Sequence, residues 1–248
     1  MKRLAHVSIF VEGAEDSRFL QEVIQKWYHI KVSRPESSTQ EANRNDSEKM
    51  PEIREQAGEQ TDILHIGGKT KIAKAIQAFQ ENNANGLQNI LFLDADSVQK
   101  DEQWGGVRNT RAYLNHIRDV HKIVIDKAYI FPNCTEVERD DEDTEGDLET
   151  ILEHIAVEKT LLSCWDGYVS CIAQSAVSEK KMYKAPGSKT KFYAYTEAVL
   201  RNADDAGGSR RKYQNAFWNL DPNIAQLGGL RYLNPLKDFL DTIISNQT

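Results

Sequence analysis

The chain has 248 residues, of which 40% are hydrophobic and 28% charged, a balance typical of a globular protein with one large or two small domains. Its three cysteines, Cys134, Cys164 and Cys171, form no CxxC pair, which argues against a disulfide framework and a thiolate zinc site. No apolar run reaches membrane-span length and the first residues show no signal-peptide pattern, so we expect a cytoplasmic protein with no membrane partner. The net charge of −7 argues against a protein that coats nucleic acid, although it is compatible with a local basic groove.

The first 132 residues alternate between two kinds of pattern. Apolar, β-branched runs predict strands, and runs with apolar residues at helical spacing predict helices. The predicted strands are residues 4–11, 62–66 (followed by a glycine turn at 67–68), 89–96 and 127–132, and the predicted helices are residues 15–28, 70–82 and 109–121. This alternation indicates right-handed crossovers and an α/β fold with a mainly parallel sheet, flanked by helices on both faces. Residues 33–60 are polar with little periodicity and predict an insertion or a mobile loop.

The pattern becomes helical after residue 149. The predicted helices of this part are residues 148–157, 159–177, 192–202 and 232–244. We therefore expect an α/β core over residues 1–157, followed by a helical C-terminal extension with a basic surface over residues 158–248.

Acidic residues follow three of the predicted strands. Glu12 comes directly after the first strand, and Asp94 and Asp96 end the strand at residues 89–96 with only Ala95 between them. The acidic loop that contains Asp147 and Glu149 follows the strand at residues 127–132. In sheets of this kind, ligands bind beyond the carboxyl ends of the strands. A divalent cation at this rim would offset the repulsion between the carboxylates, and hard oxygen ligands favour Mg²⁺ or Mn²⁺ over Zn²⁺.

Charge is unevenly distributed along the second half of the chain. Residues 136–149 contain nine acidic residues and one basic residue, and residues 178–213 contain nine basic and four acidic residues. A solvated loop and a solvated helical surface explain these segments equally well. An acidic mouth beside a basic, tyrosine-bearing surface also suits a metal-dependent enzyme that acts on a phosphate polymer.

The segment IGGKT at residues 66–70 invites a nucleotide-binding interpretation. A Walker A loop needs a glycine five positions before Gly68, where this chain has Ile63, so the segment is not a P-loop. Gly67 and Gly68 still allow a small anion-binding nest before the following helix.

Three segments resemble the Toprim (topoisomerase–primase) family, specifically its small stand-alone or OLD-nuclease-like branch. They are VEGAEDSRFL (11–20), LFLDADS (91–97), and FPN (131–133) with GDLETIL (146–152). The family pattern is a glutamate after the first strand, often as EGxxD, and a later DxD after a hydrophobic strand. The matching residues are Glu12, Gly13, Asp16, Asp94 and Asp96, followed by Gly146, Leu148 and Glu149.

The resemblance covers residues 5–155 and implies a Toprim-like (Rossmann-like) sheet with metal-dependent phosphodiester chemistry. It implies an Mg²⁺- or Mn²⁺-dependent nuclease that acts on DNA or RNA, with a role as an effector in phage defence. The implied metal ligands come from Glu12, Asp16, Asp94, Asp96, Asp147 and Glu149. The implied catalytic residues are Glu12, Asp94, Asp96, Glu149 and Lys191.

Several of these residues have simpler interpretations, which stay open. Asp16 and Glu149 also suit helix N-termini, where acidic side chains are favoured. The expected nucleic-acid contacts equally suit plain surface positions; they are Lys184, Lys189, Lys191, Arg210 and Arg211. A partner protein such as a defence-system ATPase, and a homodimer, are both compatible with the resemblance.

Two rival functions remain from other classes. A nucleotide-sugar glycosyltransferase also ends a buried strand with a DxD that holds Mn²⁺, although it has no use for Glu12 or the late acidic cluster. A non-catalytic Toprim-like module that binds a partner protein needs none of the acids that this chain retains.

Overall fold

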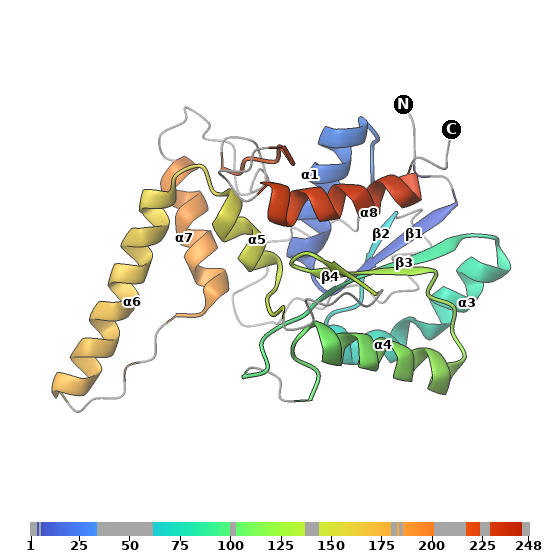
Figure 1. The fold of residues 1–248 in the computed structure, drawn as a ribbon, viewed down its shortest axis with the longest axis horizontal. Coiled ribbons are helices and arrows are strands. Elements are labelled where there is room, and N and C mark those ends of the chain that lie inside the picture. The colour runs from blue at the N-terminus through green and yellow to red at the C-terminus, as the bar shows by residue number, and fades with distance from the viewer. Residues whose placement is uncertain are drawn as a thin grey trace, which may run out of the picture. The chain divides into compact units, whose positions relative to one another are not determined.

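The computed structural model describes most of the chain, which divides into two compact units (Figure 1). The described residues are 4, 6–33, 62–99, 103–136, 144–179, 183, 186–200, 217–223 and 229–244. Residues 34–60 of the predicted insertion lie outside them, as do Lys184, Arg210 and Arg211. The first unit comprises Met1–Leu148 with Asn234–Thr248, and the second comprises Glu149–Leu233.

A five-stranded sheet forms the centre of the first unit. Its strands lie in the order β2-β1-β3-β4-β5, and every neighbouring pair is parallel except β4 and β5. The strands are β1 (Val7–Val11), β2 (Ile63–His65), β3 (Gln88–Asp94), β4 (Lys127–Phe131) and β5 (Cys134–Thr135). The predicted α/β class and mainly parallel sheet are therefore confirmed. The antiparallel strand β5 was not predicted, because two residues carry too little pattern to identify a strand.

Helices cover both faces of this sheet (Figure 1). The pair α1 and α8 lies on one face, and the pair α3 and α4 lies on the other. Their bounds are α1 (Ala14–Tyr28), α3 (Ile76–Ala84), α4 (Val107–His121) and α8 (Asn234–Ile244). The predicted helix at residues 70–82 instead begins as the 3₁₀ helix η1 (Lys69–Ala75). The hydroxyl of Tyr113 donates to the carbonyl of Lys69, at 2.9 Å, and so ties the start of η1 to α4.

Alternation along the strands supplies each face with its own apolar layer. Phe10 of β1 is fully buried and packs on Phe79 of α3, with ring centroids 4.4 Å apart. On the opposite face, Phe92 of β3 and Tyr129 of β4 pack against Phe239 of α8, at 5.5 and 5.2 Å. The strands are buried on both faces, as expected for a parallel sheet covered by helices.

The last helix, α8, belongs with the sheet rather than with the helical extension in which the sequence analysis placed it. Its buried face includes Leu236, Phe239 and Leu240. The hydroxyl of Tyr28 donates to the carboxylate of Asp241, at 2.7 Å, and joins α8 to α1. The sequence prediction identified an amphipathic helix here, but periodicity does not reveal which apolar surface such a helix covers.

The described residues of the second unit lie mostly in helices. Its helices are the remainder of α5 (Leu148–Ile155), α6 (Lys159–Glu179), α7 (Ser188–Leu200) and the π-helical turn η4 (Gly229–Leu233). Trp218 is fully buried and packs against Phe192 and Tyr195 of α7, with ring centroids 5.9 and 4.9 Å apart. None of the helices described in either unit has the length and apolar character that a membrane span requires.

Candidate functional site

Glu12 stands at the carboxyl end of β1 and is fixed by backbone N–H donors. Its Oε1 accepts from the N–H of Asp94 (3.2 Å) and its Oε2 from the N–H of Lys69 (3.1 Å). Its own carbonyl accepts from Gly67 (2.8 Å) and Gly68 (3.0 Å). These glycines have φ values of 83° and 121°, which side chains disfavour. The N–H groups considered above as an anion nest therefore bind Glu12.

Burial perturbs the ionisation of Glu12. Loss of solvation raises the pKa of its carboxyl from 4.5 to about 6, and the negative charge of Asp96 adds to this rise. The positive charge of Lys69 and the two backbone N–H donors act in the opposite direction. Glu12 therefore carries a charge at neutral pH that the folded protein stabilises poorly. A cation beside this carboxylate would relieve that cost.

The residues of the DxD pair are held from a second direction by the segment before α5. Asp94 Oδ1 accepts from the N–H of Leu148 at 3.2 Å. The backbone N–H of Asp96 donates to the carbonyl of Gly146 (2.7 Å), and the N–H of Gly146 donates to the carbonyl of Asp96 (3.2 Å). Asp96 adopts a left-handed conformation, with φ 58°. The Gly-Asp-Leu-Glu segment thus reaches the DxD pair through its backbone.

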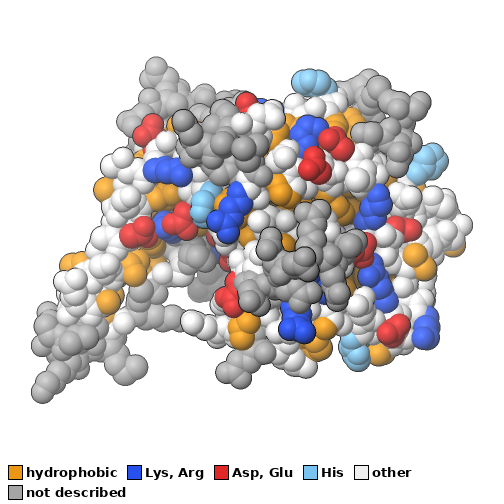
Figure 2. Space-filling model, in the orientation of Figure 1, with side chains coloured by type: hydrophobic (Ala, Val, Ile, Leu, Met, Phe, Trp, Pro, Cys, Tyr) orange, Lys and Arg blue, Asp and Glu red, His pale blue; other side chains and the backbone are white. Residues whose placement is uncertain are grey.

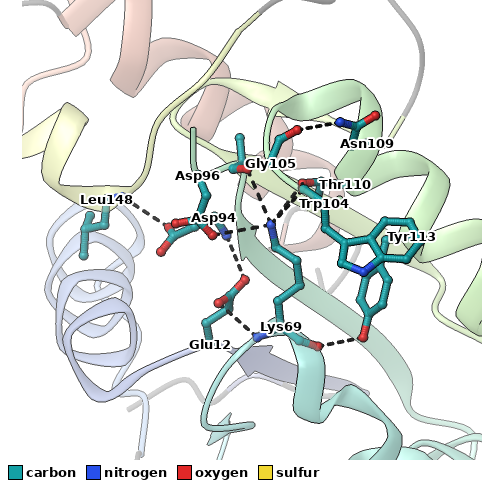
Figure 3. A network of polar contacts seen from close by, with 11 residues as sticks. Glu12, Lys69, Asp94, Asp96, Trp104, Gly105, Asn109, Thr110, Tyr113 and Leu148 are labelled. Carbon is teal, nitrogen blue, oxygen red and sulfur yellow. Dashed lines mark hydrogen bonds and ion pairs between the residues drawn. The ribbon is translucent and has the colours of Figure 1, made fainter. Parts of the chain in front are cut away.

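Lys69 lies beside these acids, and the sequence analysis did not assign it a role. Its side chain is only 5% exposed, and its Nζ lies 3.5 Å from Asp96 Oδ2. Figure 3 shows the carboxylates of Glu12, Asp94 and Asp96 on one side of the Lys69 ammonium, with Trp104, Thr110 and Tyr113 on the other. Part of the charge offset expected from a metal ion is therefore supplied by the protein. The available signal was the strand β2, which places the residues after it next to β1.

We call Glu12, Asp94 and Asp96 the acid cluster. Glu12 follows β1 and Asp94 ends β3, and these are neighbouring parallel strands, so both acids lie at the same edge of the sheet. The sequence prediction that these residues come together is consistent with this arrangement. Their hard oxygen donors suit a cation such as Mg²⁺, which proteins often bind through one or two carboxylates together with water and substrate phosphate. Among the residues that the structure describes, no three His, Cys, Asp or Glu side chains form a group that could hold a metal ion.

The other predicted acids have different positions. Asp16 is buried, and its Oδ2 accepts from the N–H of Gly13 at 2.8 Å, so it caps the start of α1. Asp147 is partly exposed at the start of α5. Glu149 is buried in the first turn of α5, where the second unit begins. The hydrogen bond to Gly13 therefore supports the interpretation of Asp16 as a helix cap.

The predicted basic contacts are only partly described. Lys191 is buried in the second unit, where its Nζ donates to Glu153 Oε1 (2.7 Å) and Asp166 Oδ1 (2.8 Å). Burial alone would lower the pKa of Lys191, but these two partners outweigh it and raise the pKa. Lys189 is exposed. On the face in Figure 2, the described Lys and Arg side chains are interspersed with acidic ones and form no continuous basic stripe.

Comparison with known proteins identifies one family. The family described as "Protein of unknown function (DUF3226)" matches residues 6–230, which include the sheet and the acid cluster. Neither the curated proteins nor the solved structures include a significant match to this chain.

Proposed function

The chain belongs to the DUF3226 family, for which no function is described, and from the acid cluster we propose that it is an Mg²⁺-dependent nuclease with a Toprim-like fold. Its substrate is a phosphodiester bond in DNA or RNA, and it acts in the cytoplasm. The observation that carries the proposal is the meeting of Glu12 and Asp94 at the ends of two adjacent parallel strands, where the N–H of Asp94 donates to Glu12 at 3.2 Å.

The local chemistry supports a site for a cation and a phosphate. The acid cluster brings three carboxylates near one ammonium, and the pKa of Glu12 is raised to about 6 by burial. Such perturbed acids are typical of functional sites. The order of a glutamate after the first strand and a DxD after a buried strand also agrees with the Toprim resemblance, which supplies the choice of nucleic acid as the substrate.

Each residue of the proposed site has a role that follows from its position. Glu12 and Asp94 would hold the divalent cation beside Asp96, and such an ion lowers the pKa of a bound water and stabilises charge on the phosphate. The backbone N–H groups of Lys69, Asp94 and Leu148 donate to the carboxylates of Glu12 and Asp94 and fix their direction, so that little rearrangement is needed when a ligand arrives. Lys69 supplies a buried positive charge at the same edge.

End-labelled DNA and RNA, single- and double-stranded, test the proposal when incubated with the protein and Mg²⁺, Mn²⁺ or EDTA. We expect cleavage with either metal, none with EDTA, and a loss of at least about a hundredfold in Asp94→Asn. Glu81→Gln, which changes an exposed acid of α3, is the matched control and should cleave as the wild type does. Metal binding without cleavage of any substrate would favour the non-catalytic module, and metal-dependent release from a nucleotide sugar would favour the glycosyltransferase.

A further inference from the structure

The Lys69 ammonium is held in place by four oxygen atoms. Nζ lies 3.2 Å from Thr110 Oγ1, 3.3 Å from the carbonyl of Trp104, 3.4 Å from the carbonyl of Ala95 and 3.5 Å from Asp96 Oδ2 (Figure 3). An ammonium has three N–H donors, so these acceptors satisfy it fully. Because three of the four are neutral groups of the protein itself, the position of this charge does not depend on a ligand.

The backbone of Lys69 is anchored as firmly as its side chain. Its N–H donates to Glu12 Oε2 (3.1 Å), and its carbonyl accepts from the hydroxyl of Tyr113 (2.9 Å). The preceding Gly68 supplies the turn that brings the residue to this edge, with φ 121°. Lys69 is therefore a fixed component of the site and differs in this respect from a surface lysine that samples many rotamers.

The three acids of the cluster differ in what they face. Asp96 pairs with the Lys69 ammonium, and its backbone is fixed by two hydrogen bonds with Gly146. The carboxylate of Glu12 accepts one backbone N–H on each oxygen. A carboxylate offers about four acceptor positions, so Glu12 keeps the capacity to bind a cation as well. Asp96 thus lies 3.5 Å from the ammonium, whereas Glu12 and Asp94 stand at the ends of two neighbouring strands.

We propose that this site takes a single divalent cation, bound through Glu12 and Asp94, and that Lys69 is the second positive charge, neutralising Asp96 in place of a second metal ion. The charges balance on this assignment: three carboxylates carry three negative charges, the ammonium supplies one positive charge, and one divalent cation supplies two. The proposal rests on the proposed function for the presence of a metal. It makes Lys69 a positioning residue that sets the number of metal ions and the role of Asp96.

Manganese binding to the full chain, followed by the electron paramagnetic resonance of free Mn²⁺, tests this assignment. The wild type should bind one Mn²⁺ per chain, and Asp94→Asn should lose the binding. Asp96→Asn should keep one equivalent, with affinity weakened about thirtyfold, the effect of one unit charge on a divalent ion about 4 Å away in water. Lys69→Met should bind Mn²⁺ about thirtyfold more tightly, because it removes a like charge at a similar distance from the divalent ion.

The double variant Lys69→Met with Asp96→Asn guards against misfolding, because it removes both members of the buried ion pair and leaves no unpaired charge. It should bind one Mn²⁺ with wild-type affinity, and its thermal unfolding should remain cooperative. Two equivalents in the wild type, or loss of binding in Asp96→Asn equal to that in Asp94→Asn, would overturn the assignment while leaving a metal-dependent nuclease intact. One equivalent with the expected variant pattern but no strand cleavage would support the assignment and refute the nuclease. A wild type that binds no Mn²⁺ would overturn both.

Discussion

Replacement of Glu12 by glutamine should change the pH dependence of stability in a defined direction. The pKa of Glu12 is raised from 4.5 to about 6, mainly by burial. The folded protein therefore disfavours the charged carboxylate, at a cost of about 2 kcal/mol that is complete above about pH 6 and absent below about pH 4.5. Glutamine cannot ionise, so the variant lacks this cost at every pH.

Glutamine also carries a cost of its own. It keeps one acceptor oxygen, so that one of the two N–H donors of Asp94 and Lys69 loses its partner, at about 1–3 kcal/mol. This cost does not vary with pH. The free energy of unfolding of Glu12→Gln, relative to the wild type, should therefore rise by about 2 kcal/mol between about pH 4 and about pH 8, whatever its absolute sign.

Urea unfolding in EDTA, followed by circular dichroism at several pH values, measures this difference. Glu81→Gln on α3 is the matched control, because Glu81 is exposed and glutamine can still accept the hydrogen bond from Gln77 Nε2. Its difference from the wild type should stay flat across the series. A flat difference for Glu12→Gln as well would show that burial does not perturb this carboxylate, and would remove the electrostatic argument for a cation beside it.

Three further substitutions test other contacts. Asp16→Ala removes the cap of α1 and should lower the free energy of unfolding by about 0.5–2 kcal/mol while leaving Mn²⁺ affinity unchanged; a loss of Mn²⁺ binding would instead make Asp16 a ligand. Burial alone would raise the pKa of Asp241, but hydrogen bonds from Lys237 and Tyr28 lower it below 3.8. Asp241→Asn should therefore be less stable than the wild type at neutral pH, and acid titration should erase the difference as the pH falls below about 3.8; a difference that persists in acid would contradict this origin. Lys191→Met should cost about 1 kcal/mol of stability with Mn²⁺ binding retained, and calorimetry showing lost Mn²⁺ binding would return Lys191 to the site.

The parallel sheet could be predicted because its strands are short, apolar and separated by amphipathic helices. Each strand and crossover of residues 4–132 follows a local pattern, and the register then brings Glu12 and Asp94 to neighbouring strand ends. The position of the acid cluster at one edge of the sheet could be predicted for the same reason, since the carboxyl ends of parallel strands share one edge.

The role proposed for Lys69 could not be predicted from the sequence, because it depends on distances between segments far apart in the chain. Lys69 follows β2, whereas Trp104 and Thr110 lie 35 and 41 residues later, around the start of α4, and no periodicity relates the two segments. The glycines before Lys69 drew attention to a phosphate-binding loop, whereas their N–H groups bind Glu12 instead. The placement of α8 had the same limit, because its contacts with Tyr28 and Phe92 are also long-range.

Anomalous diffraction from a crystal grown with Mn²⁺ tests the acid cluster most directly. The account predicts one anomalous peak within coordination distance, about 2.0–2.2 Å, of carboxylate oxygens of Glu12 and Asp94, with the Lys69 ammonium still beside Asp96. A peak bound by Asp96 after displacement of Lys69, a second peak in the cluster, or Mn²⁺ bound only elsewhere on the chain would contradict it.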